Sequence, residues 1–315
     1  MNPVAGMLAF LLAPQQPTGV PPAVELAPFA MPRDSFFTAT LHVPPLEAAM
    51  PLDDGVVSSR LQLSCARSID EAVVHGVRSR FDADLWEWAA PEIACGCGRN
   101  FEFGVRAAVR GWDEQKDVFE VRDDSGSLIV RDEQAMASFG TATQRHENVS
   151  DLLLRGKLAL LRGDDGVSAL AVTLAADLPV SRAGDLTNAG TSELSLTLLG
   201  SLALGPDLAL HANCGGSAVF GRQTLFTTDV RVDDVVHGGV GASLRLLPSL
   251  VLGAQVEGNS SPFAGVPFLD GPVLTCGAGA RCLCGHGVSL ELGAERGLTR
   301  QSAEFEVFFQ FGLIF

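Results

Sequence analysis

Alternation of hydrophobic and polar positions is the strongest pattern in the chain, and it is clearest at the carboxy terminus. The stretch "SAEFEVFFQFGLIF", residues 302–315, carries an apolar side chain at every second position from Phe305 to Phe315. Successive side chains of a β-strand point to opposite faces, so one face of this strand is wholly apolar. An exposed apolar strand of this length promotes aggregation unless a protein core or lipid covers it.

The same alternation recurs from residue 56 onward. In "TSELSLTLLGSLALG", for example, Leu194, Leu196 and Leu198 share one face, and Glu193 and Ser195 share the other. A two-sheet sandwich alternates in the same way, so alternation alone does not define the fold. We expect twelve strands, at 56–66, 81–97, 101–111, 150–161, 167–178, 191–204, 208–220, 234–246, 250–259, 272–284, 287–296 and 302–315.

The links between these strands alternate between short and long. The short links, rich in Gly, Asp, Asn and Pro, have the composition of tight turns. In an up-and-down array all short links lie at one end, as in outer-membrane barrels with tight periplasmic turns and longer extracellular loops. The sequence therefore predicts an all-β fold, an antiparallel up-and-down transmembrane β-barrel of about 12 strands, with 10 or 14 as alternatives. The short links are 98–100, 162–166, 205–207, 247–249 and 285–286, and the others are 67–80, 112–149, 179–190, 221–233, 260–271 and a modest 297–301.

Composition agrees with a barrel and excludes some functions. Hydrophobic residues make up 47% of the 315 residues, yet no run approaches the roughly 18 to 20 apolar residues of a membrane helix. The formal net charge is −15, and no basic patch is visible that would neutralise phosphates. We therefore expect no nucleic-acid partner.

The first residues differ from the rest of the chain. "MLAFLLAP" at 7–14 is similar to a signal-peptide core, but no Lys or Arg precedes Arg33. Residues 14–34 are rich in Pro, which pairs poorly in sheets, and indicate a linker or a periplasmic plug-like arm. We expect a weakly signal-like, Pro-rich segment at 1–34 and the barrel at 35–315.

Three stretches resemble a known but uncharacterised family of bacterial proteins predicted to be outer-membrane β-barrels. They are "ENVSDLLLRGKLALL", "VTLAADLPVSRAGDLTNAGTSELSLTLLGSLALG" and "LRLLPSLVLGAQVEGNSSPF". The similarity runs through most of residues 56–315. The resemblance implies a barrel in the outer membrane of Gram-negative bacteria, and it supplies no catalytic residues because the family has no assigned activity. The final strand is also similar to the signal that the barrel assembly machinery reads, which would rest on Phe315, Phe311 and Phe309.

Candidate catalytic and metal-binding residues have simpler interpretations. His211 and His237 share the lumen-facing parity, but we expect them on the order of 20 Å apart, at about 3.3 Å per residue, which is too far to share a proton. The cysteines form C-x-C pairs rather than the C-x-x-C of zinc or redox sites. All seven carry the parity of the apolar face: Cys65, Cys95, Cys97, Cys214, Cys276, Cys282 and Cys284. We predict no enzyme activity, no cofactor and no metal.

The link 112–149 has a pattern of its own. "DVFEVRDDSGSLIVRD" indicates two short β runs around Asp124, Ser125 and Gly126, a hairpin above the barrel. Its acidic residues allow contact with Ca²⁺ or lipopolysaccharide through divalent ions, although the spacing is not that of an EF-hand. A solvated extracellular hairpin is the simpler interpretation.

The hypothesis about function rests on the charged residues that are predicted to face the lumen. We predict a narrow channel or facilitator for small polar or charged solutes; the alternative is a closed structural or surface-interaction barrel. Because Glu102 and Glu193 are too few to neutralise the cations of the third and fourth strands, a hydrated lumen with modest anion preference follows. The expected partners are outer-membrane lipid, lipopolysaccharide and the assembly machinery, and the oligomeric state is left open. The lumen-lining candidates are Arg60, Glu102, Arg106, Arg110, Arg155, Lys157, Glu193, Arg245, Glu257, Arg281, Glu291, Glu295, Glu304 and Glu306.

Overall fold

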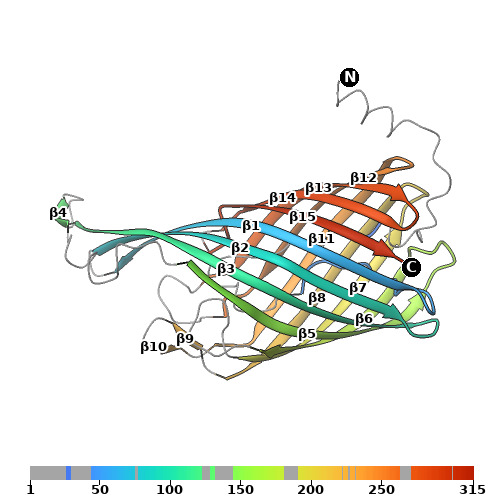
Figure 1. Ribbon diagram of the computed structural model, residues 1–315, viewed down its shortest axis with the longest axis horizontal. Coiled ribbons are helices and arrows are strands. Elements are labelled where there is room, and N and C mark those ends of the chain that lie inside the picture. The colour runs from blue at the N-terminus through green and yellow to red at the C-terminus, as the bar shows by residue number, and fades with distance from the viewer. Residues whose placement is uncertain are drawn as a thin grey trace, which may run out of the picture.

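The computed structural model is a closed antiparallel β-barrel of twelve strands (Figure 1). It describes residues 26–29, 44–74, 77–122, 128–131, 145–180, 191–221, 223–225, 228–230, 232–262, 271–299 and 301–315. Side chains are described within these ranges except at 68–90, 108, 110–151, 223–225 and 228–230. No helix in the described part of the chain is long and apolar enough to cross a membrane.

Each barrel strand pairs with its neighbours in the chain, and two pairings close the cylinder. β1 pairs with β15, and β2 pairs with β3, so the sheet has no free edge along the barrel. The predicted strand number is therefore confirmed. The barrel strands are β1 Val57–Val74, β2 Val77–Gly96, β3 Phe101–Arg122, β5 Arg145–Arg162, β6 Ala169–Pro179, β7 Ser192–Ala203, β8 Leu208–Phe220, β11 Val235–Leu247, β12 Leu250–Asn259, β13 Val273–Gly285, β14 Val288–Gly297 and β15 Phe305–Ile314.

Three short strands lie outside the cylinder. β4, Leu128–Arg131, pairs with the end of β3, so the predicted hairpin around residues 124–126 is present. β9, Gln223–Leu225, and β10, Thr228–Val230, pair only with each other. The acidic side chains predicted to contact divalent ions in this hairpin lie outside the described residues.

The short links all lie at one end of the barrel, together with the start of β1 and the carboxy terminus. The Val57 and Phe315 backbones exchange two hydrogen bonds there, of 3.2 and 2.8 Å. Gly98 and Gly166 in two of these turns have positive φ values of 76° and 71°, which a residue with a side chain rarely adopts. We call this the turn end, and the opposite end the loop end.

The prediction was wrong about the first long link. We expected strand only to residue 66 and again from 81, but β1 continues to Val74 and pairs there with Val77 of β2. β3 and β5 likewise extend into the predicted loop 112–149. These extensions project from the barrel (Figure 1), where the apolar alternation that identifies a membrane strand is not needed.

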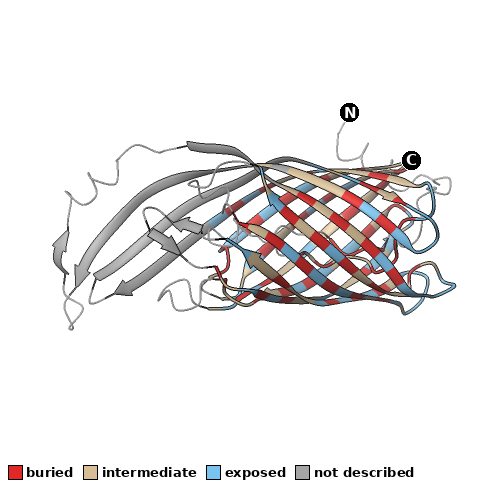
Figure 2. Ribbon diagram, turned by 90° about the horizontal axis from the view of Figure 1, so that it is seen from below, coloured by how far each residue is buried: buried red, intermediate tan, exposed pale blue. Residues whose placement is uncertain are grey.

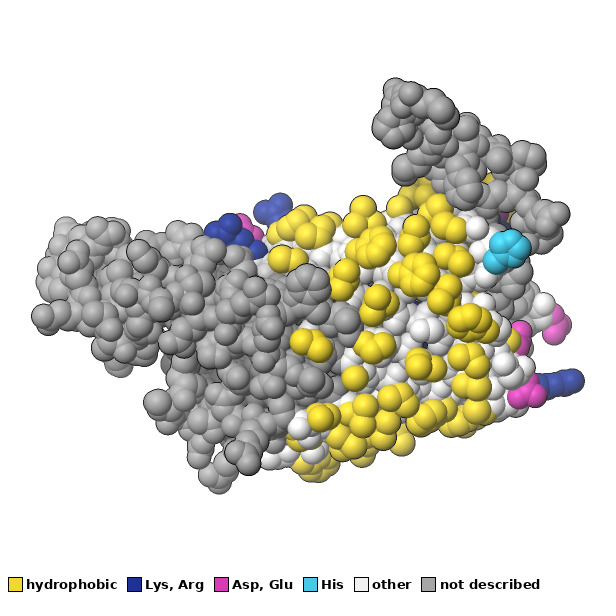
Figure 3. Space-filling view, in the orientation of Figure 1, with side chains coloured by type: hydrophobic (Ala, Val, Ile, Leu, Met, Phe, Trp, Pro, Cys, Tyr) yellow, Lys and Arg dark blue, Asp and Glu magenta, His cyan; other side chains and the backbone are white. Residues whose placement is uncertain are grey.

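Burial alternates along the strands as the sequence predicts. Along β7, Glu193, Ser195 and Thr197 are buried, and Leu194, Leu196 and Leu198, which alternate with them, are exposed. The same checkerboard covers the described wall (Figure 2), and apolar side chains cover the outer face (Figure 3). On β15, Phe305, Val307 and Phe309 are exposed, and Glu306 and Gln310 are buried. The outside of this barrel is therefore the apolar surface and the inside the polar one.

Candidate functional site: an occupied lumen

Two pieces of the amino-terminal region lie inside the barrel. Residues 26–29 are buried among β8, β11, β12 and β13, and residues 44–52 lie between β3 and β12 along the other part of the wall. We call them together the lumen segment. It makes hydrogen bonds and ion pairs with the polar inner face of the barrel. Leu26, Phe29 and Ala49 also pack in apolar clusters with wall residues, including Val251, Phe308 and Leu199.

Arg281 of β13 holds the first piece. Its guanidinium donates to the carbonyl oxygens of Ala27 and Pro28, at 2.9 and 3.3 Å, and to Glu291 at 2.7 Å. It also lies 5.0 Å from the ring centroid of Phe29, a cation–π distance. One side chain therefore fixes both the backbone and the aromatic anchor of residues 26–29.

Glycines in the wall make room for the lumen segment. A β-carbon at Gly253 would overlap the Phe29 ring, and one at Gly279 would lie 3.1 Å from that ring. A β-carbon at Gly241 would lie 2.7 Å from Leu46. The glycines of "GGVGAS" and "CGAGAR" therefore serve close packing, as their position within strands predicts.

His211 and Ser201 join the two pieces of the lumen segment. The Ala49 amide donates to Ser201 Oγ at 2.9 Å, and Ser201 Oγ lies 2.9 Å from His211 Nδ1. His211 Nε2 lies 2.7 Å from the Leu26 carbonyl oxygen, so Nε2 carries a proton and donates. His237 instead contacts Thr197 Oγ1 at 2.9 Å. The register places the two histidines four residues apart along neighbouring strands, about 13 Å rather than the predicted 20 Å, and each has its own structural partner.

A cluster of charges holds the second piece. Arg155 of β5 contacts three carboxylates, those of Glu47, Glu92 and Glu102, at 2.5, 2.7 and 2.9 Å. Lys157 contacts Glu47 at 3.2 Å and donates to the Ala48 carbonyl oxygen at 3.0 Å. Burial raises the pKa of a carboxyl, but the nearby Arg155 and Lys157 outweigh that effect and lower the pKa of Glu47 to about 2.

This cluster corrects the predicted charge balance. We expected too few carboxylates near Arg155 and Lys157, and from this an excess of positive charge. The sequence interpretation missed Glu92, which has the inward parity of β2, and Glu47, which belongs to no strand and so has no parity to read. Glu47, Glu92 and Glu102 give Arg155 and Lys157 three nearby carboxylates, while Arg60 and Arg106 are the register partners of Glu92. The predicted shortage of carboxylates around Arg155 and Lys157 is therefore wrong.

The fully buried positions of the described wall are acidic overall, and the half-buried Arg60, Arg106 and Arg245 share their lumen-facing parity. The buried carboxylates of the wall outnumber its buried Arg and Lys by seven to three. Two pairs of carboxylates occupy directly paired positions, Asp177 with Glu193 and Glu295 with Glu306, all within two residues of the loop end of their strands. The buried carboxylates are Glu102, Asp177, Glu193, Glu257, Glu291, Glu295 and Glu306, and the buried cations are Arg155, Lys157 and Arg281.

The remaining predicted lining residues are less buried. Arg60, Arg106 and Arg245 are half-buried, and Arg245 lies 3.8 Å from Asp207 at the turn end. The side chain of Arg110 lies outside the described part of the structure. Glu304 departs from the prediction: it is exposed, because it precedes Phe305, the first residue of β15, and so lies beyond the sheet.

Comparisons with known proteins show the fold. No family model matches the chain, and no curated protein matches it by sequence, so membership of the uncharacterised family remains a hypothesis. Among solved structures, an outer membrane channel from Pseudomonas putida F1 has a TM-score of 0.60 at 12% identity, over 85% of this chain and 98% of that one. The NanC porin has a TM-score of 0.45 at 8% identity, over 82% of this chain and 98% of that one. The chain is thus similar in fold to outer-membrane β-barrels.

Proposed function

We propose that this chain is an outer-membrane channel for small polar or charged solutes, with a preference for cations. The observation that carries the proposal is the combination of an apolar outer face with an acidic inner face on a closed barrel. Rings of Asp and Glu are the usual means by which pores favour cations. The similar structure from Pseudomonas putida is described as an outer membrane channel, which supports the proposal.

The lumen segment sets the conductance in this proposal. Leu26 and Phe29 pack against apolar residues of the wall. The segment otherwise contacts β3, β5, β7, β8, β11, β12 and β13 through hydrogen bonds and ion pairs. Such contacts exchange with water when the segment moves, at a small net cost per bond. We therefore expect a small conductance when the segment is seated and a larger one when it leaves.

The second candidate is a closed structural barrel, and the lumen segment itself favours it. A segment that never leaves would seal the lumen, and the barrel would then serve only as a membrane scaffold for its loop-end extensions. The two candidates differ in one measurable property, the ion current through a reconstituted barrel.

The test is a planar bilayer recording with a KCl gradient across the membrane. The proposal predicts a small conductance with a reversal potential on the cation-selective side, and a shift toward zero in the double variant Glu295→Gln and Glu306→Gln. Glu304→Gln removes an exposed carboxylate that precedes β15 and lies beyond the sheet; it is the matched control and should change nothing. No current in the wild-type protein supports the closed barrel instead.

A further inference from the structure

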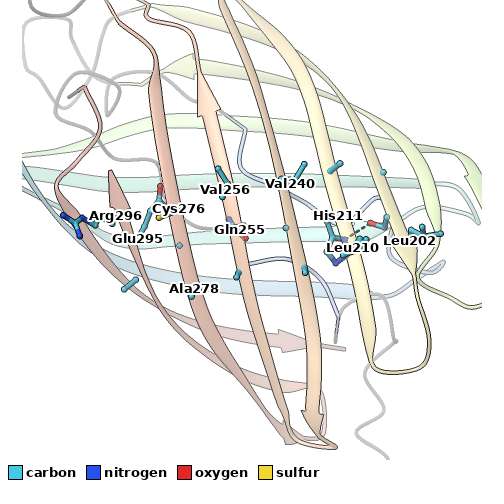
Figure 4. A pocket seen from close by; sticks show the side chains of 18 of the residues that line it. Leu202, Leu210, His211, Val240, Gln255, Val256, Cys276, Ala278, Glu295 and Arg296 are labelled. Carbon is cyan, nitrogen blue, oxygen red and sulfur yellow. Dashed lines mark hydrogen bonds between the residues drawn. The ribbon is translucent and has the colours of Figure 1, made fainter. Parts of the chain in front are cut away.

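A groove of about 960 Å³ lies on the outer face of the barrel, on the wall from β7 to β15. Its lining includes Leu202, Leu210, Val240 and Val256, which are exposed on the outside. It also includes the inward-facing residues Ser201, His211, Gln255 and Glu295, but no residue of the lumen segment. Figure 4 views this wall with β8, β11, β12 and β13 in front and the opposite wall behind. The apolar lining of the groove is therefore formed by the outer face of the wall.

The register explains why the wall is hollowed here. Four alanines form one unbroken row across β11, β12, β13 and β14, each directly paired with the next: Ala242, Ala254, Ala278 and Ala294. The parallel row toward the loop end contains Val240, Val256 and Cys276. The row toward the turn end contains Leu244, Leu252, Ala280 and Leu292, none of which lines the groove. The alanine row is therefore a low floor beside Val240 and Val256, which form one side of the groove.

The groove runs between the two ends of the barrel. Arg296 and Phe305 line one end of it, at the loop end of β14 and β15, and Leu202 lines the other, one residue from the turn end of β7. Figure 4 shows Arg296, Cys276, Val256, Val240, Leu210 and Leu202 in this order. Because barrel strands are tilted, a row that crosses them obliquely descends through the membrane.

Arg296 is a cation on an otherwise apolar face. Its side chain is exposed, and the described residues offer it no ion pair or hydrogen bond. Its register neighbours are Cys276 on β13 and Phe305 on β15. A guanidinium on a lipid-facing surface is costly at the bilayer centre and tolerated near the interface, which is where the loop end of β14 lies in the proposed orientation. There it is placed to bind a phosphate through paired N–H donors.

We propose that the groove binds a phosphate-bearing acyl lipid of the surrounding membrane. The acyl chain lies on the alanine floor, and the phosphate binds Arg296 at the loop end. The assignment rests on the proposed membrane placement, and it combines two independent features, a concave apolar track and a cation at the end where lipid head groups lie. An Arg near the membrane interface raises the affinity of a protein for anionic lipid by about fivefold.

The experiment uses the full-length protein in nanodiscs of phosphatidylcholine with a minor fraction of phosphatidylglycerol carrying the same acyl chains. Native mass spectrometry after release counts the phosphatidylglycerol retained per barrel. Two variants test the two parts of the site: Arg296→Gln removes the cation, and Ala254→Leu with Ala278→Leu fills the floor. The matched controls are Arg99→Gln, an exposed turn-end arginine, and Ala176→Leu with Ala218→Leu, which lie on the outer face of β6 and β8 beside Leu194.

The proposal predicts that wild-type and control proteins retain phosphatidylglycerol over phosphatidylcholine. Arg296→Gln should lower that retention about fivefold, and the filled-floor variant should also lower it. Equal retention in the test and control variants, in barrels that insert normally, overturns the lipid site and leaves the membrane placement intact. A dimer mass that the filled-floor variant abolishes also overturns it, because the groove is then a subunit interface. Failure of the wild-type protein to enter nanodiscs overturns both proposals.

Discussion

Arg155 on β5 and Glu47 in the lumen segment form an ion pair of 2.5 Å inside the barrel, although 108 positions separate them in the chain. Lys157 shares the same carboxylate at 3.2 Å. The wall therefore depends on a residue outside every strand to balance its cations. The lumen segment therefore fills space inside the barrel and also neutralises positive charge on the wall.

Substitution of Glu47 tests this dependence. Glu47→Gln removes one of three carboxylates on Arg155, and the lost charge-assisted contacts are worth about 1 to 3 kcal/mol of segment retention. We expect more frequent openings in single-channel recordings, with normal insertion. Glu304→Gln, an exposed carboxylate, should match the wild type; equal opening in both variants would show that Glu47 does not hold the segment.

The pH dependence of the wild type follows from the same pair. The pKa of Glu47 is lowered to about 2, so its contribution is complete above the ordinary value near 4.5 and is lost as the pH falls through about 2. Openings that depend on this pair should therefore not increase between pH 8 and pH 5.

Phe29 is the apolar anchor of the first piece of the segment. Phe29→Ala removes the ring that Gly253 and Gly279 accommodate and the cation–π contact with Arg281. Truncation of a buried Phe costs about 3 to 5 kcal/mol, so we expect a conductance several times that of the wild type. Phe220→Ala, at an exposed position of β8, is the control. An unchanged conductance with Phe29→Ala would mean that residues 26–29 do not limit the current.

The position of the carboxy-terminal residue leads to a separate prediction about assembly of the barrel into the membrane. Phe315 is exposed on the outer face, and its backbone pairs with Val57 where the barrel closes. Phe315→Ala should reduce the amount of heat-modifiable protein in the outer membrane far more than truncation of residues 1–25. The comparison is read from gel migration of membrane fractions, and equal amounts of the Phe315 variant and wild type would contradict the assembly role.

Labelling of the cysteines tests whether the apolar outer face of the barrel contacts lipid or water. Cys214 is exposed on β8, Cys276 is half-buried on β13, and neither has a disulfide partner. A membrane-impermeant thiol reagent should leave both unlabelled in intact membranes, while Cys97, exposed in a turn, should react once the turn end is accessible. Labelling of Cys214 at the rate of Cys97 would place this face in water.

The sequence predicts the wall better than the contents of the barrel. Alternation such as that of Leu194, Glu193 and Ser195 follows from the opposite environments of the two faces, and it locates every barrel strand. Alternation carries no information about a segment without a strand, so the positions of Leu26, Phe29 and Glu47 were not predictable from it.

Two features of the sequence could nonetheless have indicated that a segment lies inside the barrel. The run "LAPF" lies in residues 14–34, interpreted as a linker or a periplasmic plug-like arm. The run "PPLEAAM", apolar with one carboxylate, lies in the barrel region 35–315 before its first predicted strand. The excess of cations on β5, predicted from Arg155 and Lys157, required a counter-charge from elsewhere in the chain. From the sequence, screening by water was the simpler explanation of how these cations are tolerated. In the structure, Glu47 and Glu92 supply the counter-charge.

The most direct test of the account is the single-channel conductance of a variant that lacks residues 26–52, compared with the full-length chain in the same bilayer. Heat-modifiable migration establishes first that the shortened barrel folds and inserts. The account predicts a several-fold larger conductance that remains cation-selective, because the acidic wall stays in place when the lumen segment is removed. A folded, inserted variant with the wild-type conductance, or with anion selectivity, would contradict it.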